Sequence, residues 1–518
     1  MSELATIAPQ PSILETASPP LRDEILSGRF FGHRHPTADE QTAAFAYLPP
    51  ADALASWFGP AVAMRLAGDL DACRAALDRD IAAIDELIGG QLDVILHHPR
   101  LRRFEGCWRG LAWLAGGLDP TGRVRLKMLN LAWAELCRDL ERAVEFDQSQ
   151  LFQKIYENEF GMPGGEPYGL LVVDHEVRHR PMPGAPADDV NALAQLAAVA
   201  AAAFAPTVLA ASPALLQVED FADLAMVTEL GDPFRSAEFT RWRSLSSREE
   251  MRFVAVALPR LLARTPWDDD PARADGFRYA EYAPSADCRV WMNAGYAFAA
   301  VVARAFANHS WPADVRGSET DYIGGGLVTD LPVEPFRTDS DHTWVRPPVD
   351  IVFSDRIEAA LVEAGLMPLS ALPYGEEAVF SAVRSLQAPA SYSGPTAAAA
   401  NANARLSAQI NAMLCVSRFA HYVKIIGRDM VGSFRTAEEV EAQLQSWLTD
   451  YVNTSVAAGP EMRARYPLVG ARVTVRERPG RPGVYGCVIL LQPHFQLDDV
   501  TASFRLVTDI AAPGATAA

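Results

Sequence analysis

Apolar positions between residues 403 and 434 recur at steps of three and four, which predicts one long amphipathic helix with a wide apolar face. These positions are Leu406, Ile410, Met413, Leu414, Val416, Phe419, Val423, Ile426, Met430 and Phe434. A second helix is predicted after Thr436, which suits an N-cap because Glu438 and Glu439 follow it in the first turn.

The spacing then changes to strand-like runs. Residues 473–478 and 484–491 flank the Pro/Gly-rich turn 479–483, which predicts a β-hairpin, and a last strand is predicted over 502–507. Two helices on a small antiparallel sheet, with no evident catalytic residue among them, form a unit suited to holding neighbouring proteins.

Upstream, unbroken apolar runs at 170–175, 207–210 and 253–259 alternate with helical patterns, which predicts a central α/β layer. Helical spacing dominates residues 70–146, interrupted by a candidate strand at 124–129. We therefore predict a mixed α/β (α+β) fold with a helical N-terminal region, a central α/β layer, and a C-terminal unit of helices on an antiparallel sheet. The expected domains are 1–69, 70–150, 151–390 and 391–518.

Residues 1 to about 50 are rich in Pro, Ala, Thr and Ser, which indicates a flexible arm. Within it, 21–26 could form a short helix, and the spacing of Leu21, Ile25 and Leu26 would suit a partner's groove. A loosely packed tail is the alternative. One helix is predicted over 52–66.

The composition limits which classes of partner the protein can bind and indicates the cellular compartment in which it works. The 518 residues carry 49% apolar and 21% charged side chains, as globular proteins do, and a net charge of -19. That charge disfavours nucleic acid or an anionic membrane surface as the main partner. The N-terminus lacks a signal-peptide pattern, the apolar run 192–216 is interrupted by two prolines, and the six cysteines are scattered. We expect a cytoplasmic protein without membrane insertion or disulfides.

A search for catalytic patterns finds little. Nucleophile elbows, zinc-protease motifs and phosphate-binding loops are absent, and the glycine clusters at 161–169 and 324–326 lack the order or spacing that phosphate binding needs. The adjacent histidines His97 and His98 would point in different directions on a helix, so no metal or cofactor is predicted. The run 174–176 (Asp-His-Glu) follows a predicted strand, which leaves an α/β enzyme open as an alternative.

Several local strings together resemble one family. They are 156–161 (YENEFG) with 164–169 (GGEPYG), 97–99 (HHP) with 108–111 (WRGL), 239–245 (FTRWRSL), 258–260 (LPR) with 264–267 (RTPW), 291–296 (WMNAGY), 325–332 (GGLVTDLP), 365–369 (GLMPL), 407–410 (SAQI) and 421–424 (HYVK). Together they resemble the large subunit of the contractile sheath of bacterial type VI secretion systems, the TssC or VipB type. The resemblance covers roughly residues 80–510.

The resemblance implies a structural protein without enzymatic activity or cofactor. Its expected partners are a small sheath subunit, copies of itself in a helical sheath, the inner tube protein, the baseplate, and a hexameric ATPase that disassembles the contracted sheath. The C-terminal unit would resemble that of phage tail sheaths. Its strands would then link subunits, through Val473, Val475, Val484, Val488, Leu490, Phe504 and Leu506.

The small subunit is expected to pack on the helical zone, through Leu77, Ile81, Ile84, Leu87 and Ile88, which share one helix face up to the pair Gly89-Gly90. A short N-terminal helix is the ATPase handle in this family, and Leu21, Ile25 and Leu26 are the candidates here. The extra Pro-rich arm departs from the family pattern. A non-contracting adaptor or baseplate paralogue is therefore a further alternative.

Overall fold

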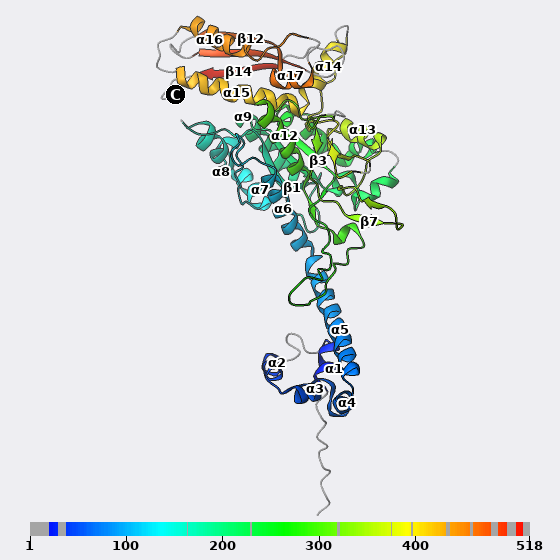
Figure 1. The fold of residues 1–518 in the computed structure, drawn as a ribbon. Coiled ribbons are helices and arrows are strands. Elements are labelled where there is room, and N and C mark those ends of the chain that lie inside the picture. The colour runs from blue at the N-terminus through cyan, green and yellow to red at the C-terminus, as the bar shows by residue number, and fades with distance from the viewer. Residues whose placement is uncertain are drawn as a thin grey trace, which may run out of the picture. The chain divides into compact units, whose positions relative to one another are not determined.

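The computed structural model describes residues 20–28, 38–162, 164–227, 230–318, 322–373, 375–394, 397–430, 436–455, 459–477, 485–494 and 504–510. The chain divides into two compact units, Met1–Leu101 with Pro266–Cys288, and Arg102–Thr265 with Arg289–Ala518 (Figure 1). Each unit is described by itself below.

The first unit is mainly helical. Its helices are α1 (Leu21–Leu26), α2 (Ala38–Ala46), α3 (Pro50–Phe58), α4 (Pro60–Leu66) and α5 (Leu70–Leu96). The stretch that composition indicated to be an arm thus carries α1 and α2 at its described residues. In the next two helices, α3 and α4, Pro50 and Pro60 occupy first helical positions, where proline favours a helix. The single helix predicted over 52–66 is wrong: Gly59, with a φ of 82°, separates α3 from α4.

Helix α5 is longer than the pattern predicted. It begins at Asp69, whose carboxylate accepts hydrogen bonds from the backbone N–H groups of Asp71 and Ala72. It continues through Gly89 and Gly90, which the sequence had suggested as its end. A Cβ at Gly89 would lie 3.4 Å from the ring of Tyr279, so this glycine serves close packing rather than termination.

A buried carboxylate joins α1 and α3 to α5. Asp80 is 4% exposed and accepts hydrogen bonds from Arg22 Nε (2.8 Å to Oδ2) and Trp57 Nε1 (2.9 Å). Burial would raise the pKa of Asp80, but the hydrogen bonds from Arg22 and Trp57 outweigh it, and the pKa lies below its ordinary value. The Pro266–Cys288 segment is held to α5 by Tyr279 Oη, which donates to Asp93 Oδ1 at 2.8 Å.

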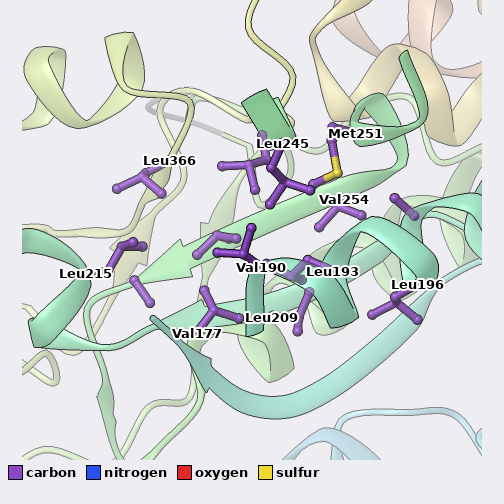
Figure 2. Packing of buried hydrophobic residues seen from close by; sticks show 14 of the residues in the cluster. Val177, Val190, Leu193, Leu196, Leu209, Leu215, Leu245, Met251, Val254 and Leu366 are labelled. Atoms are coloured by element: carbon purple, nitrogen blue, oxygen red, sulfur yellow. The ribbon is translucent and has the colours of Figure 1, made fainter. Parts of the chain in front are cut away.

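The second unit is built on a parallel sheet of order β1-β2-β3-β9. Its strands are β1 (Leu171–Val177), β2 (Thr207–Ala211) and β3 (Val254–Leu258), as the unbroken apolar runs predicted, together with β9 (Met367–Pro368), which those runs did not predict. Leu209 and Val256 pack on one face with α9 (Asp189–Ala203), as Figure 2 shows for Leu209 and its neighbours. Val208 and Ala255 pack on the other face with α12 (Ala294–His309). The predicted α/β layer is therefore confirmed, with both faces covered.

The remaining elements of this region connect and cover the sheet. The helices are α6 (Pro99–Gly116), α7 (Trp133–Arg142), α8 (Gln150–Phe152), α10 (Gly231–Arg235), α11 (Thr240–Ser246) and α13 (Asp355–Glu363), with a π-helix η3 (Gln153–Phe160) and 3-10 turns η2 (Phe146–Gln148), η4 (Pro213–Leu216), η5 (Phe221–Met226), η6 (Ala237–Phe239) and η7 (Glu249–Phe253). The 3-10 turn η8 (Ala286–Cys288) belongs to the first unit. Short strands are β4 (Leu261–Leu262), β5 (Trp291–Met292), β6 (Leu327–Val328), β7 (Pro335–Arg337), β8 (Thr343–Val345), β10 (Ser370–Ala371) and β11 (Ala378–Val379). The candidate strand at 124–129 is wrong as a paired strand, because these residues pair with no other strand in the part of the chain that the structure describes.

The C-terminal part combines helices with an antiparallel sheet of order β12-β13-β14 (Figure 1). The elements are α14 (Ala397–Ser407), α15 (Ile410–Met430), α16 (Ala437–Thr449), α17 (Pro460–Arg465), β12 (Leu468–Glu477), β13 (Tyr485–Pro493) and β14 (Phe504–Ile510). The predicted cap is confirmed: Thr436 Oγ1 accepts from the backbone N–H of Glu439, and Thr436 N donates to the Glu439 carboxylate at 2.9 Å.

The single long helix predicted from 403 is wrong, since it breaks between α14 and α15. Ala408 turns its carbonyl to Ser385, which donates from both its backbone N–H (2.8 Å) and its hydroxyl (2.7 Å). Past the break, α15 joins two cores, because Ile410 and Leu414 pack with the α/β layer while Val416 and Phe419 pack with the C-terminal sheet. Phe434 lies outside the described residues.

We predict that Asp80→Asn loosens α1. Removing the charge weakens two hydrogen bonds at a buried acceptor, a loss of about 1–3 kcal/mol. Because the pKa of Asp80 is depressed by folding, the stabilisation is present above the unfolded value of about 3.9 and is lost as the pH falls through the folded value. Hydrogen–deuterium exchange of Leu21–Leu26 should accelerate about tenfold at pH 7, and the difference from the parent should shrink in acid.

The matched control is Asp78→Asn, an exposed carboxylate on the same helix. Its effect should stay within about 0.5 kcal/mol. Equal exchange rates of α1 in the parent and Asp80→Asn would show that Asp80 does not hold this helix.

Candidate functional site

The acid-His-acid run on β1 is occupied by structural contacts. His175 is buried, its Nε2 lies 3.1 Å from Asp189 Oδ1, and its ring stacks on Trp133 with centroids 4.0 Å apart. Trp133 Nε1 donates to the same Asp189 oxygen at 2.8 Å. The imidazole is thus held between an indole and a helix-terminal carboxylate.

Asp174 is engaged in a second cluster. Its carboxylate accepts from Tyr296 Oη at 3.2 Å and from Asn293 Nδ2 at 3.3 Å, and Cys107 Sγ lies 3.7 Å from the same tyrosine oxygen. Burial, together with the nearby charge of Asp174, raises the pKa of Cys107 to about 11. The thiol therefore stays protonated at neutral pH and is a poor nucleophile.

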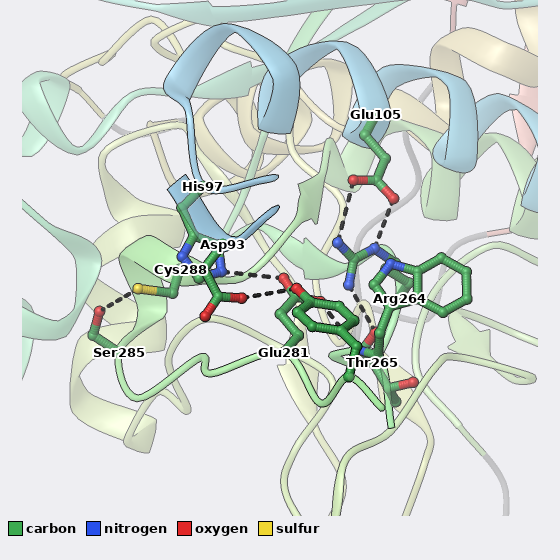
Figure 3. A network of polar contacts seen from close by, with 10 residues as sticks. Asp93, His97, Glu105, Arg264, Thr265, Glu281, Ser285 and Cys288 are labelled. Carbon is green, nitrogen blue, oxygen red and sulfur yellow. Dashed lines mark hydrogen bonds and ion pairs between the residues drawn. The ribbon is translucent and has the colours of Figure 1, made fainter. Parts of the chain in front are cut away.

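His97 also has a structural partner. Its Nε2 lies 3.2 Å from Glu281 Oε1, and the other carboxylate oxygen of Glu281 accepts from the backbone N–H of Trp267 (Figure 3). Across the described ranges, no three His, Cys, Asp or Glu side chains lie together in a way that could hold a metal ion. None of the helices in these ranges is both long and apolar enough to cross a membrane.

The predicted small-subunit row on α5 is solvent-exposed. Leu77, Ile81, Leu87 and Ile88 are between 36% and 53% exposed, and Ile84 is half-buried. The row continues along the helix with Val94 and Ile95, which are also exposed. This length of apolar helix surface takes no part in the core of its own unit, so it is available to another protein.

The predicted linking residues fall on different strands of the C-terminal sheet. Val473 and Val475 are buried on β12, facing the helices, whereas Phe504 and Leu506 belong to β14. Val488 and Leu490 lie on the central strand β13, whose backbone is paired on both sides. Val484 lies outside the described residues. Only β12 and β14 are therefore edge strands in this sheet, and Val488 and Leu490 can contact a neighbour only through their side chains.

Side chains of α16 cover the outer edge of β12. Gln445 accepts from Val473 N at 2.9 Å and donates to Ala471 O at 3.1 Å, and Glu441 accepts from Val475 N at 2.8 Å. These bonds replace those that a further strand would make. The pattern analysis missed both residues, although their spacing of four places them on one face of the predicted helix.

The outer edge of β14 has no strand partner among the described residues. The backbone of β14 is therefore the edge of this sheet at which another strand can add without displacing α16.

A further surface lies at residues 124–131, where the chain forms neither helix nor paired strand. Arg125 is ion-paired to Glu166 at 2.6 Å and Lys127 to Glu159 at 2.6 Å. The alternate side chains Leu126 and Met128 are exposed. Arg125 and Lys127 are exposed as well, so the ion pairs tie the segment to Glu166 and Glu159 while its charged and apolar side chains both stay open to solvent.

The candidate handle residues Leu21, Ile25 and Leu26 are half-buried on α1. This helix is held to α5 by the bond between Arg22 and Asp80.

Comparison with known proteins assigns the family. Residues 78–387 match the EvpB/VC_A0108 tail sheath N-terminal domain, and residues 399–510 match the EvpB/VC_A0108 tail sheath gpW/gp25-like domain. The chain is also 36% identical over 440 residues to the type VI secretion system sheath protein TssC1 of Pseudomonas aeruginosa, covering 84% of this chain and 86% of that protein. With both sheath domains matched in order and a sheath protein aligned over most of its length, the chain belongs to the VipB/TssC family of type VI secretion sheath proteins.

Proposed function

We propose that this chain is the large structural subunit of a contractile sheath. It pairs with a small sheath subunit, polymerises helically with copies of itself around an inner tube, and contracts to expel that tube. The observation that carries the proposal is the exposed apolar row on α5, within the region that matches the sheath N-terminal domain. A subunit that works alone would bury such a row in its own core.

The α5 row is the proposed surface for the small subunit. Full burial of a Leu or Ile side chain is worth about 1.5–3 kcal/mol, so covering these partly exposed residues would contribute about 0.5–1 kcal/mol each. A helix that presents its anchors along one face suits an amphipathic helix of the partner.

The strand surfaces would join successive subunits. A neighbour's strand can add to the outer edge of β14, and main-chain hydrogen bonds would then connect the subunits while allowing their angles to change. The extended segment 124–131 offers a second place for strand addition, with Leu126 and Met128 as apolar contacts. Contacts that do not close on themselves generate helical filaments.

Sheath contraction requires two packings of the same subunits that differ modestly in free energy and sum along the assembly. In this proposal the baseplate starts the sheath and a hexameric ATPase takes the contracted form apart, with α1 as its handle. The assembly is proposed to work in the cytoplasm, which agrees with free cysteines at all six positions. No catalysed reaction is part of the proposal.

A non-contracting adaptor or baseplate paralogue is distinguished by assembly. Co-expression with the small subunit should give long tubes under negative-stain electron microscopy if the chain is a sheath subunit. Soluble pairs that never polymerise would favour the adaptor.

Val488→Glu should prevent tube formation while leaving pairing intact. Val488 lies on β13, opposite Thr474 and Val507, between the core-facing Cys487 and Ile489. A charge there would oppose contact with a neighbour without entering the core. Tubes are scored by electron microscopy and pairing by co-purification. Ala442→Glu, exposed on α16, is the control and should form tubes. Loss of pairing in Val488→Glu would assign this surface to the small subunit instead.

Ile81→Glu should weaken pairing with the small subunit by tenfold or more, because a buried, unpaired charge costs more than about 1.4 kcal/mol. The change should leave folding intact, since Ile81 is 53% exposed. Affinity is measured by titration of the purified subunits or by co-purification yield. Ala82→Glu, exposed and about 100° further round the helix, is the control. Unchanged pairing in Ile81→Glu would remove α5 from the interface.

A further inference from the structure

A small polar pocket lies at the base of the C-terminal sheet, within the second unit. It has a volume of about 70 Å³ and is lined by the loop 313–316, by α15 and α17, and by residues 467 and 493–494 next to the ends of β12 and β13. A cavity of this size holds a few water molecules or one small oxyanion. Its walls come from both regions that match sheath domains.

Two arginines in this pocket have no counter-ion. Arg316 and Arg463 form no ion pair and no side-chain hydrogen bond with any residue that the structure describes, and Arg463 Nε is buried. Burial lowers the pKa of Arg316, with no carboxylate to offset it. Both arginines are partly buried, and a partly buried cation without a partner is costly, so a ligand that supplies negative charge would be favoured here.

Other arginines of the same unit, unlike these two, are paired with carboxylates. Arg264 is paired with Glu105 at 2.6 Å and Arg289 with Glu334 at 2.9 Å, as Figure 3 shows for the first pair. The chain carries 65 acidic residues against 46 basic ones, so carboxylates are abundant. Two unpaired guanidinium groups in one pocket are therefore a specific feature of this site.

The other polar atoms of the pocket limit the chemical class of ligand that it could bind. His494 Nε2 and Asn411 Oδ1 are buried and have no partner among the described residues. Burial, and secondly the charge of Arg463, lower the pKa of His494, so its ring is neutral at pH 7 and can accept a proton donor. Asp314, the one carboxylate in the lining, already accepts from Gly325 N at 2.9 Å. The pocket thus combines cationic donors with neutral acceptors.

We propose that this pocket binds a phosphate group that retains one proton, with Arg316 and Arg463 on its oxygens and Asn411 or His494 accepting from its hydroxyl. Hydrogen phosphate and a singly protonated phosphomonoester both offer acceptors and a donor, whereas sulfate and carboxylates offer acceptors only. The bound group would tie α17 and the β13 end to the loop 313–316, and so hold the C-terminal sheet to the α/β layer. This inference is independent of the proposed sheath function.

The test uses the full-length protein and inorganic phosphate. Phosphate should raise the unfolding temperature saturably relative to chloride at equal ionic strength, and titration followed by ³¹P line broadening should give the same midpoint. Sulfate should bind at least tenfold more weakly. Phosphoserine serves as the ester probe: binding equal to that of phosphate would indicate an esterified ligand, and weaker binding a free phosphate, both within the proposal.

Variants locate the site. Arg316→Gln and Arg463→Gln should each weaken phosphate binding about tenfold or more, the loss expected for one charge-assisted hydrogen bond. Arg465→Gln, exposed on the same helix α17, is the matched control and should keep the parent affinity. The wild-type comparison of phosphate with sulfate stands even if a variant fails to fold. An unsaturable response, equal effects of phosphate and sulfate, or an equal loss in Arg465→Gln would overturn the proposal.

Discussion

Backbone N–H and C=O groups along a sheet edge need partners, and the C-terminal sheet meets this need differently at its two edges. On β12 the partners are the side chains of Glu441 and Gln445, which project from α16 onto the strand. On β14 no further strand is paired among the described residues, and helix α15 lies close to this strand. Because side-chain bonds and strand bonds compete for the same backbone groups, a strand that adds at β12 must first displace α16.

Strand addition at this sheet could transmit force only if the layer that supports the sheet were rigid. The parallel sheet beneath is buried on both faces, and α15 contributes Ile410 and Leu414 to that layer while Val416 and Phe419 reach into the C-terminal core. A single helix therefore joins the two cores through side chains on its different faces. Close-packed cores transmit displacement because they have little free volume to absorb it. A pull on the C-terminal strands would pass through α15 to the α/β layer rather than dissipate in a linker.

The sequence predicted those features that depend on local patterns. The buried strands at 171–177, 207–211 and 254–258 followed from unbroken apolar runs, and the start of α16 followed from the Thr436 cap. The break before α15 could not be predicted, because it depends on Ser385, which lies more than twenty residues away in the sequence. The central position of β13 could not be predicted either. Strand order depends on which strands pair, and a hairpin pattern does not contain that information.

Among the candidate surfaces, too, the sequence predicted local features and missed those that depend on distant residues. The exposed row on α5 was visible in the sequence because a helix face is a local property, and its exposure in the structure is what a partner-binding face requires. The segment 124–129 was also visible as an alternation, but its attachment was not, since the ion pairs of Arg125 and Lys127 involve the distant residues Glu166 and Glu159. The residues of the enzyme alternative likewise have structural partners that the sequence did not reveal. Asp174 and His175 have the residue types of a catalytic site, yet Asp174 accepts a hydrogen bond from Tyr296, and His175 stacks on Trp133 with its Nε2 3.1 Å from Asp189 Oδ1. A site needs unfilled space as well as suitable chemistry, and packing decides where that space remains.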